Sequence, residues 1–278
     1  MRKISKDSIS YFIQGIRKKR MKCPYCGGIS KVYAKKYIVI DICKCLNCGL
    51  FFVNPMYEPR QGVEKFYNDF YNSDATYIPD IKELEALKET NFREGIKDYN
   101  ERLSVIKRLV GGGRLLEFGS SWGYFLFQAK AYSFSPVGIE IAEKRRQFGQ
   151  LNLGVDILPD IDSVDGKFDV IYSAHVLEHL MSLKNLFDKF YEKLSLGGSL
   201  IIEVPNFDPD TKGKSVYKII GSVHPLGFSK EFFERNLARH GFSELNIAGN
   251  YEDLLKNNEE SFPLKDVIVI HAKKDKEL

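Results

Sequence analysis

The segment LLEFGSSWGYF at residues 115–125 constrains the fold of this chain more than any other stretch. An apolar run ends in the acid Glu117, a turn carrying Gly119 and Gly123 follows, and residues 125–131 then favour a helix. A strand, a glycine turn and a helix N-terminus in this order commonly cradle a nucleoside-bearing cofactor, because glycine lets the backbone approach the ligand. The spacing differs from the Gly-x-Gly-x-x-Gly of dinucleotide-binding proteins, so we do not expect a pyrophosphate loop.

Glu117 indicates the charge of the ligand, since a carboxylate would repel a diphosphate but attract an ammonium or a sulfonium group. The run Glu117-Phe-Gly119-Ser-Ser121-Trp-Gly123 resembles the acid-x-Gly-x-Gly-x-Gly motif of S-adenosylmethionine-dependent methyltransferases of the seven-strand, Rossmann-like type, with Ser121 in place of the middle glycine. The resemblance implies an α/β fold with a doubly wound, mostly parallel seven-stranded sheet. It also implies that Glu117, Gly119, Ser121 and Gly123 bind S-adenosylmethionine.

Two acids downstream fit the same plan. Residues 136–140, PVGIE, read as a short buried strand that ends in Glu140. In a doubly wound sheet an acid at the tip of the second strand accepts hydrogen bonds from the ribose hydroxyls, and we expect this of Glu140, with a solvated, helix-capping glutamate as the alternative. Asp160 follows an expected third strand, where the resembled family often contacts the adenine, although a solvated loop acid fits equally well.

Two more buried strands are expected at residues 168–173 (FDVIYS) and 197–206 (GGSLIIEVPN). Between them, residues 183–194 carry apolar side chains on one helical face, which predicts an amphipathic helix ended by the glycines that open the second strand. This arrangement resembles strands four and five of the same methyltransferases, and it implies that Ser173 lines the cofactor crevice.

The phrase His175-x-x-Glu178-His179 also matches the H-x-x-E-H motif of inverted zinc peptidases. On a helix this spacing would place the three side chains on one face. The phrase nevertheless lies where the methyltransferase pattern expects it, directly after a strand and beside the cofactor crevice. The zinc-peptidase interpretation is therefore disfavoured.

A sulfonium methyl group is already electrophilic, so a methyltransferase mainly has to align the nucleophile and exclude water. If the acceptor is a hydroxyl, a general base assists. His224, in the loop SVHPLGFS between the fifth strand and the next helix, is the first candidate, because this loop lies at the carboxyl edge of the sheet. His175, at the tip of the fourth strand, is the second candidate.

The N-terminal part carries two C-x-x-C-G knuckles, Cys23/Cys26 and Cys45/Cys48, separated by a β-rich segment. Two such pairs at this spacing predict a tetrahedral zinc site with four thiolate ligands, in which the metal supplies folding free energy that so small a module lacks. Disulfides are disfavoured because the chain shows no secretory signal. Cys43 is expected to be a spare thiol, although it could compete with Cys45 as a ligand.

The chain of 278 residues therefore divides into a basic extension (1–20), a zinc ribbon (21–58), a helical linker or cap (59–102) and a methyltransferase domain (103–278). The net charge of +4 is smaller than the surplus of the first 22 residues, which hold eight Lys or Arg and one Asp. That extension could contact RNA or an acidic membrane surface, but a solvated segment is the favoured interpretation.

Further elements are expected at both ends of the methyltransferase domain. Residues 81–109 read as mostly helical. A helix over 230–240 and closing strands over 243–248 and 267–272 are also predicted, with a polar loop at 250–263 between the strands.

The sequence thus predicts a zinc-ribbon-bearing methyltransferase that uses S-adenosylmethionine and zinc, and that O-methylates a small-molecule or sugar acceptor. The alternatives are an RNA or protein methyltransferase, in which nucleic acid becomes a partner, and a cofactor- or zinc-binding scaffold without catalysis. No stretch of the sequence is apolar enough to span a membrane, and a cytoplasmic location is expected, with a mitochondrial leader left open. The oligomeric state does not follow from the sequence.

Overall fold

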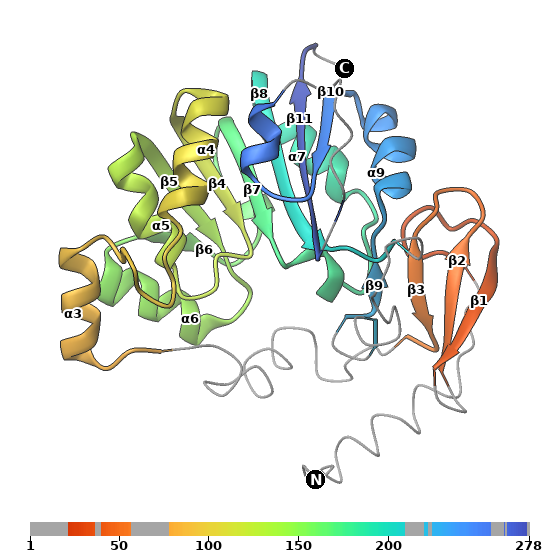
Figure 1. The fold of residues 1–278 in the computed structure, drawn as a ribbon, viewed down its shortest axis with the longest axis horizontal. Coiled ribbons are helices and arrows are strands. Elements are labelled where there is room, and N and C mark those ends of the chain that lie inside the picture. The colour runs from red at the N-terminus through yellow and green to blue at the C-terminus, as the bar shows by residue number, and fades with distance from the viewer. Residues whose placement is uncertain are drawn as a thin grey trace, which may run out of the picture.

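The computed structural model describes residues 22–36, 40–56, 78–208, 220–221, 224–256, 264 and 266–276. The expected basic extension, most of the segment that joins the ribbon to the helical cap, and part of the expected loop at 250–263 lie outside these residues. The described chain forms a large sheet covered by helices on both faces, with a small antiparallel sheet docked at one edge (Figure 1).

The large sheet has seven strands in the order β10-β11-β8-β7-β4-β5-β6. In chain order these strands are β4 (Gly113–Phe118), β5 (Phe134–Ile139), β6 (Asp156–Leu158), β7 (Phe168–Ala174), β8 (Leu194–Pro205), β10 (Phe242–Ala248) and β11 (Val267–Lys274). The pairs from β6 through β8 are parallel, whereas β11 is antiparallel to both of its neighbours. This confirms the expected doubly wound, mostly parallel α/β sheet, whose order reverses between β4 and β7.

Helices fill both faces of this sheet. The α-helices are α3 (Ile81–Glu89), α4 (Asn100–Val110), α5 (Tyr124–Ala129), α6 (Glu143–Phe148), α7 (Leu186–Lys193) and α9 (Lys230–Asn236). Short 3-10 helices are η2 (Lys130–Tyr132), η4 (Ile161–Ser163), η5 (Leu177–His179), η6 (Leu237–His240) and η7 (Glu252–Leu255), and η3 (Gly149–Leu153) is a π-helical turn.

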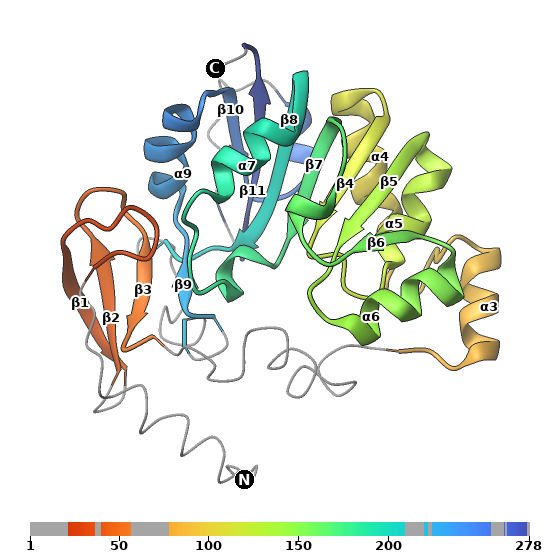
Figure 2. The ribbon, with the colours of Figure 1, turned by 180° about the vertical axis from the view of Figure 1, so that it is seen from behind.

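Alternate residues of the central strands face opposite sides of the sheet, as the period of two requires. Leu115 and Val170 pack in one core with α4 and α5, whereas Leu116 and Ile171 pack in another core with α7 and α9. The views in Figures 1 and 2 show these helix pairs on opposite faces. The near-continuous apolar runs of β4 and β7 follow from this burial on both sides.

Of two expectations about helices, the limits of one are wrong and the other is confirmed. The helix expected over 183–194 does bury one face, but α7 spans only Leu186–Lys193, and Leu194 is already extended, with ψ 142°. Gly197, with φ 77°, therefore lies inside the long strand β8 and does not terminate the helix. The segment expected to be mostly helical over 81–109 is so, as two helices, α3 and α4, separated by turns at residues 90–99.

The N-terminal module is an antiparallel sheet of β1 (Ser30–Lys36), β2 (Ile40–Cys45) and β3 (Phe51–Asn54), as its β-rich sequence indicates. A fourth strand, β9 (Leu226–Gly227), comes from the C-terminal half of the chain and pairs with β3. Ribbon residues also share one apolar core with α7 and α9. The ribbon is thus built into the domain that carries the large sheet (Figure 2).

Candidate active site

A pocket of about 580 Å³ opens at the carboxyl ends of β4, β5 and β7. Its wall includes the glycine turn after β4, the tip of β5, the turn after β6 and the segment after β7. Of the expected site residues, the pocket wall includes Gly119, Ser121, Glu140, Asp160 and His175. The volume is in the range of sites for small ligands, and the place is where doubly wound sheets bind them.

The turn after β4 requires its glycines. Gly119 has φ 87°, and a Cβ there would lie 2.3 Å from Val176 Cγ2. Gly123 has φ 85° and precedes α5, and a Cβ there would lie 2.8 Å from Val155 Cγ2. Gly119 therefore keeps the turn beside the pocket, while Gly123 allows close packing of α5 behind it.

Glu140 connects the tip of β5 to the glycine turn. Its side chain is buried, and its two carboxylate oxygens accept backbone hydrogen bonds from Ser121 N at 2.9 Å and Ala142 N at 2.8 Å. Because each carboxylate oxygen has a second lone pair, Glu140 can still accept hydrogen bonds from a ligand in the pocket. The backbone thus fixes the orientation of the acid that the sequence places at the second strand tip.

Glu117 is a buried acid at the end of β4. Its Oε2 atom has no hydrogen-bond partner among the described residues. Burial, together with the nearby charge of Glu140, raises the pKa of Glu117 well above its ordinary value. A cationic group beside this carboxylate would relieve both effects.

The remaining expected cofactor residues have separate environments. Asp160 lies on the pocket wall and caps the N-terminus of η4, where its carboxylate accepts a hydrogen bond from Ser163 N. The Ser163 side chain, and then this backbone bond, lower the pKa of Asp160. Ser173 is fully buried in β7 and donates its hydroxyl to the carbonyl oxygen of Phe118. Ser173 therefore ties two strand ends together, and Ala174 forms the pocket wall on this strand.

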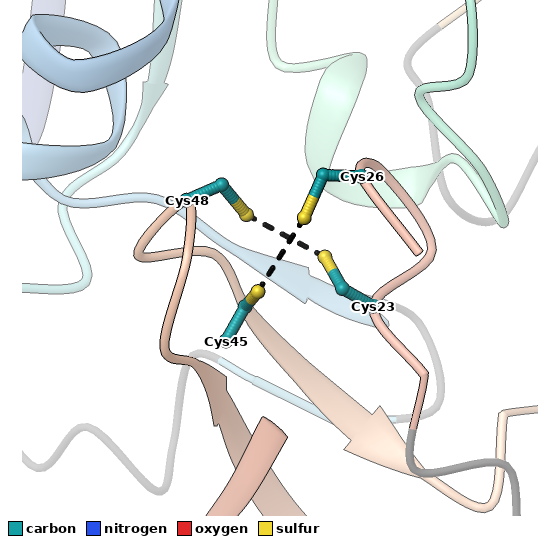
Figure 3. Close-up of side chains that lie close together, drawn as sticks. All are labelled: Cys23, Cys26, Cys45 and Cys48. Atoms are coloured by element: carbon teal, nitrogen blue, oxygen red, sulfur yellow. Dashed lines mark hydrogen bonds between the residues drawn. The ribbon is translucent and has the colours of Figure 1, made fainter. Parts of the chain in front are cut away.

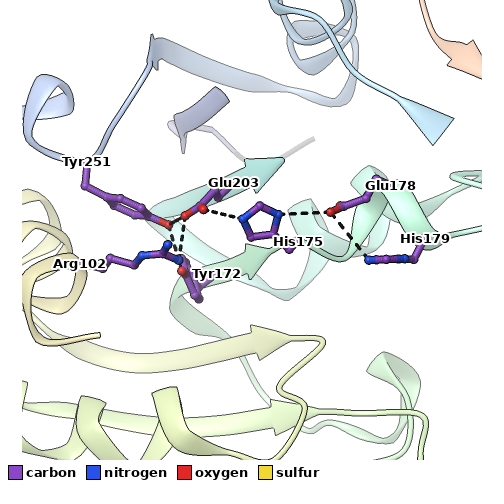
Figure 4. Close-up of polar contacts among 7 residues, drawn as sticks. All are labelled: Arg102, Tyr172, His175, Glu178, His179, Glu203 and Tyr251. Atoms are coloured by element: carbon purple, nitrogen blue, oxygen red, sulfur yellow. Dashed lines mark hydrogen bonds and ion pairs between the residues drawn. The ribbon is translucent and has the colours of Figure 1, made fainter. Parts of the chain in front are cut away.

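His175 is held between two buried acids (Figure 4). Its Nε2 lies 2.8 Å from Glu203 Oε1 and its Nδ1 lies 3.4 Å from Glu178 Oε1. The carboxylates of Glu178 and Glu203 raise the pKa of His175 to about 9. Its backbone is in the left-handed region, with φ 54°, an uncommon conformation for a residue with a side chain.

Four residues behind His175 form a polar network that the sequence analysis missed. Arg102 Nη1 lies 2.9 Å from Glu203 Oε2, and Tyr251 donates its hydroxyl to the same oxygen at 2.5 Å. The Tyr172 hydroxyl lies 3.0 Å from that of Tyr251. The sequence did offer one sign of this network, the acid Glu203 inside the apolar strand segment IIEVP, because a carboxylate in a buried strand needs polar partners.

The phrase 175–179 does not form the helix face that its spacing allowed. His175 precedes a 3-10 turn of three residues, η5, which carries Glu178 and His179. The ring of His179 packs against the ring of His224, a residue far along the chain, with the two ring centroids 4.6 Å apart. Among the described residues, Glu178, His179 and His224 form a group whose ligand atoms all lie within 4.8 Å of one another.

The four knuckle cysteines converge at one point of the ribbon (Figure 3). The Cys23 and Cys48 sulfur atoms are 3.5 Å apart, as are those of Cys26 and Cys45. Sulfur ligands of a tetrahedral zinc, with bonds of about 2.3 Å, lie about 3.8 Å apart, so this arrangement fits the ion. Cys43 is buried outside the cluster, and its burial raises its pKa to about 11.

A seven-stranded sheet in this order, with a glycine turn after its first strand and an acid at the tip of its second, defines a Rossmann-like methyltransferase. A family model described as a methyltransferase domain matches residues 87–244, more than half of the chain. The protein belongs to this methyltransferase-domain family, and it is an S-adenosylmethionine-dependent enzyme.

Solved methyltransferase structures are similar to this chain at low sequence identity. Phosphoethanolamine N-methyltransferase 2 of Haemonchus contortus, in complex with S-adenosyl-L-methionine, matches with a TM-score of 0.54 and 16% identity, over 81% of this chain and 63% of that chain. A methyltransferase of Archaeoglobus fulgidus matches with a TM-score of 0.48 and 22% identity, over 68% and 99% of the two chains. No curated protein matches the sequence significantly. Within the described residues, no helix combines the length and apolar character that crossing a membrane requires.

Proposed function

We propose that the protein transfers the methyl group of S-adenosylmethionine to a hydroxyl of a small-molecule or sugar acceptor. The observation that carries this proposal is the pocket between the turn at Gly119 and the acid Glu140. It combines a close backbone approach, an oriented carboxylate and a volume suited to one cofactor with a small acceptor.

The residues present fit the cofactor. When bound, S-adenosylmethionine supplies a methyl group on a positively charged sulfur. Glu140 would accept hydrogen bonds from the ribose, and Asp160 would lie beside the adenine. The carboxylate of Glu117 is buried, and its Oε2 atom has no hydrogen-bond partner among the described residues. It would stabilise the positive charge of the cofactor.

On the acceptor side, the chain has to orient a hydroxyl toward the methyl group and exclude water. His175 lies on the pocket wall, but both of its ring nitrogens already face carboxylates. Its geometry suits a positioning residue that holds the segment after β7. His224 lies behind His179, which is part of the wall, so the pair of histidines is the better candidate for assisting deprotonation.

The ribbon would bind one zinc ion through Cys23, Cys26, Cys45 and Cys48. Its docking supports a small acceptor, because Tyr25 of the first knuckle packs edge-on against Phe232 of α9, with ring centroids 5.3 Å apart. A ribbon fixed in this way stabilises the enzyme and positions β9. An arm that captures RNA or protein would be expected to keep its knuckles exposed.

The test incubates the purified full-length protein with methyl-labelled S-adenosylmethionine and a panel of hydroxylated small molecules, free sugars and sugar nucleotides, with bulk RNA and protein as parallel acceptors. We expect label in a small molecule. Label only in RNA, together with salt-sensitive RNA binding, would support the RNA-methyltransferase alternative. Tight cofactor binding with no transfer to any acceptor would support a non-catalytic scaffold.

A further inference from the structure

We propose that Glu178, His179 and His224 form a second metal site, separate from the cysteine cluster, that binds a divalent transition-metal ion at the acceptor side of the pocket. The inference rests on the proposed function, which it deepens by assigning the means of acceptor activation. Two imidazoles and one carboxylate are a donor set typical of catalytic divalent metals.

The first observation is the state of Glu178. Its side chain is only 2% exposed, and neither carboxylate oxygen makes a hydrogen bond among the described residues. The nearest ring nitrogens are His175 Nδ1 at 3.4 Å and His179 Nε2 at 3.9 Å. The ion pair with His175 involves Oε1 and leaves Oε2 of this buried carboxylate without a partner, which is costly, and a bound cation is one way to satisfy it.

The second observation is convergence from distant parts of the chain. The three ligand atoms lie within 4.8 Å of one another, and ligands of one ion with bonds of about 2.1 Å lie at most about 4.2 Å apart. A small inward rotation of the side chains would therefore complete the site. His179 belongs to the pocket wall, so an ion here would border the space where the acceptor enters.

The third observation is that the fold holds His224 in place. The next residue, Pro225, accepts a hydrogen bond from Val53 N at 2.9 Å, and Leu226 pairs with Phe52 of the ribbon strand β3. The short strand β9 that follows also contacts η5, which carries the other two ligands. The docked ribbon thus positions one ligand of the site.

The ion would act as a Lewis acid. It would bind the acceptor hydroxyl oxygen and lower its pKa, so that the proton leaves to solvent. The oxygen then forms a bond to the methyl carbon while the carbon–sulfur bond breaks, and its electron pair passes to sulfur. The products are the methyl ether and neutral S-adenosylhomocysteine.

The test titrates Mn²⁺ into the full-length protein, with the cysteine site kept loaded with zinc, and follows bound Mn²⁺ by electron paramagnetic resonance. Thiolates favour zinc over Mn²⁺, so the two sites are distinguished. We expect about one Mn²⁺ per chain. Glu178→Gln and, independently, His224→Ala should weaken binding at least about tenfold, since even loss of an outer partner costs roughly 10–100-fold. Glu89→Gln, an exposed carboxyl on α3, is the matched control.

Wild-type protein that binds neither Mn²⁺ nor Co²⁺ beyond the ribbon zinc would overturn the site, and so would variants that bind Mn²⁺ like wild type. The two histidines would then be a packed pair only. Calorimetry with S-adenosylmethionine distinguishes a failure of the metal site from a failure of the proposed function. Glu178→Gln should bind the cofactor with the affinity of wild type, whether or not the metal site exists. Metal binding with transfer rates unaffected by chelation and Mn²⁺ addition would overturn the catalytic role.

Discussion

The side-chain amide of Asn236 donates a hydrogen bond to the backbone carbonyl of Cys48 at 2.9 Å, across 188 positions of sequence. The contact joins α9 of the methyltransferase domain to the second C-x-x-C knuckle, and Asn236 is fully buried. Asn236→Ala should lower the free energy of unfolding by about 1–3 kcal/mol, because it leaves a buried carbonyl unsatisfied. Urea unfolding measures this effect. Asn152→Ala, at an exposed asparagine, should change stability by less than about 0.5 kcal/mol.

Removal of zinc should destabilise the whole protein as well as the ribbon. Phe52 and Cys48 belong to the same core as Phe187 and Phe232, so loss of the knuckles exposes part of the domain core. We expect a chelator to lower the Tm of the entire unfolding transition. Elemental analysis should show that the chelator removes about one zinc per chain. Cys43→Ser should retain the metal. Metal-free protein with an unchanged Tm would contradict the assignment.

Glu140→Ala should weaken S-adenosylmethionine binding by at least about tenfold. The substitution removes two charge-assisted hydrogen bonds to the ribose, each worth roughly 1.5–3 kcal/mol, and it frees the backbone amide of Ser121. Isothermal titration calorimetry measures the change. Glu143→Ala, at an exposed acid of α6, should bind like wild type. Equal affinities for the two variants would show that Glu140 does not contact the cofactor.

Glu117→Gln should weaken the cofactor complex while stabilising the free protein. Burial and the charge of Glu140 disfavour the carboxylate in the absence of a ligand, so the neutral amide removes an unfavourable charge. The same charge would favour the cationic cofactor. We expect a higher Tm without cofactor and an affinity lower by about tenfold or more. A variant with lower Tm and unchanged affinity would place Glu117 in a structural role.

His271 should make the protein less stable in mild acid. Burial, assisted by the charge of Lys273, lowers the pKa of His271 to about 4, and its Nε2 lies 3.0 Å from the hydroxyl oxygen of Ser199. The unfolded chain, with an ordinary pKa near 6.5, binds the proton first as pH falls. The part of the free energy of unfolding that depends on neutral His271 is therefore fully present above a pH of about 6.5. It is lost as the pH falls toward about 4, by up to about 3 kcal/mol. His271→Gln should flatten this slope in urea unfolding measured across the same range.

The sequence by itself determined the elements whose signal is local. The glycine turn at 119–123, the acid after the second strand and the buried strand at 168–173 each follow from patterns within about ten residues. The paired knuckles are local in the same sense, because two C-x-x-C pairs set the ligand geometry on either side of one hairpin. The doubly wound, mostly parallel seven-stranded sheet then followed from the family resemblance, and the structure confirms it.

Tertiary structure alone decided what joins distant segments. The short strand β9 pairs with the ribbon strand β3, and this pairing brings His224 to His179 of η5. No local pattern specifies such a contact, because a two-residue strand gains stability only from the sheet edge that it meets. Likewise the phrase 175–179 becomes a bend and a 3-10 turn, in which His175 has a left-handed backbone and its ring lies between the buried carboxylates of Glu178 and Glu203. The physical reason is the same in both cases: long-range packing overrides weak local preferences wherever buried polar groups must find partners.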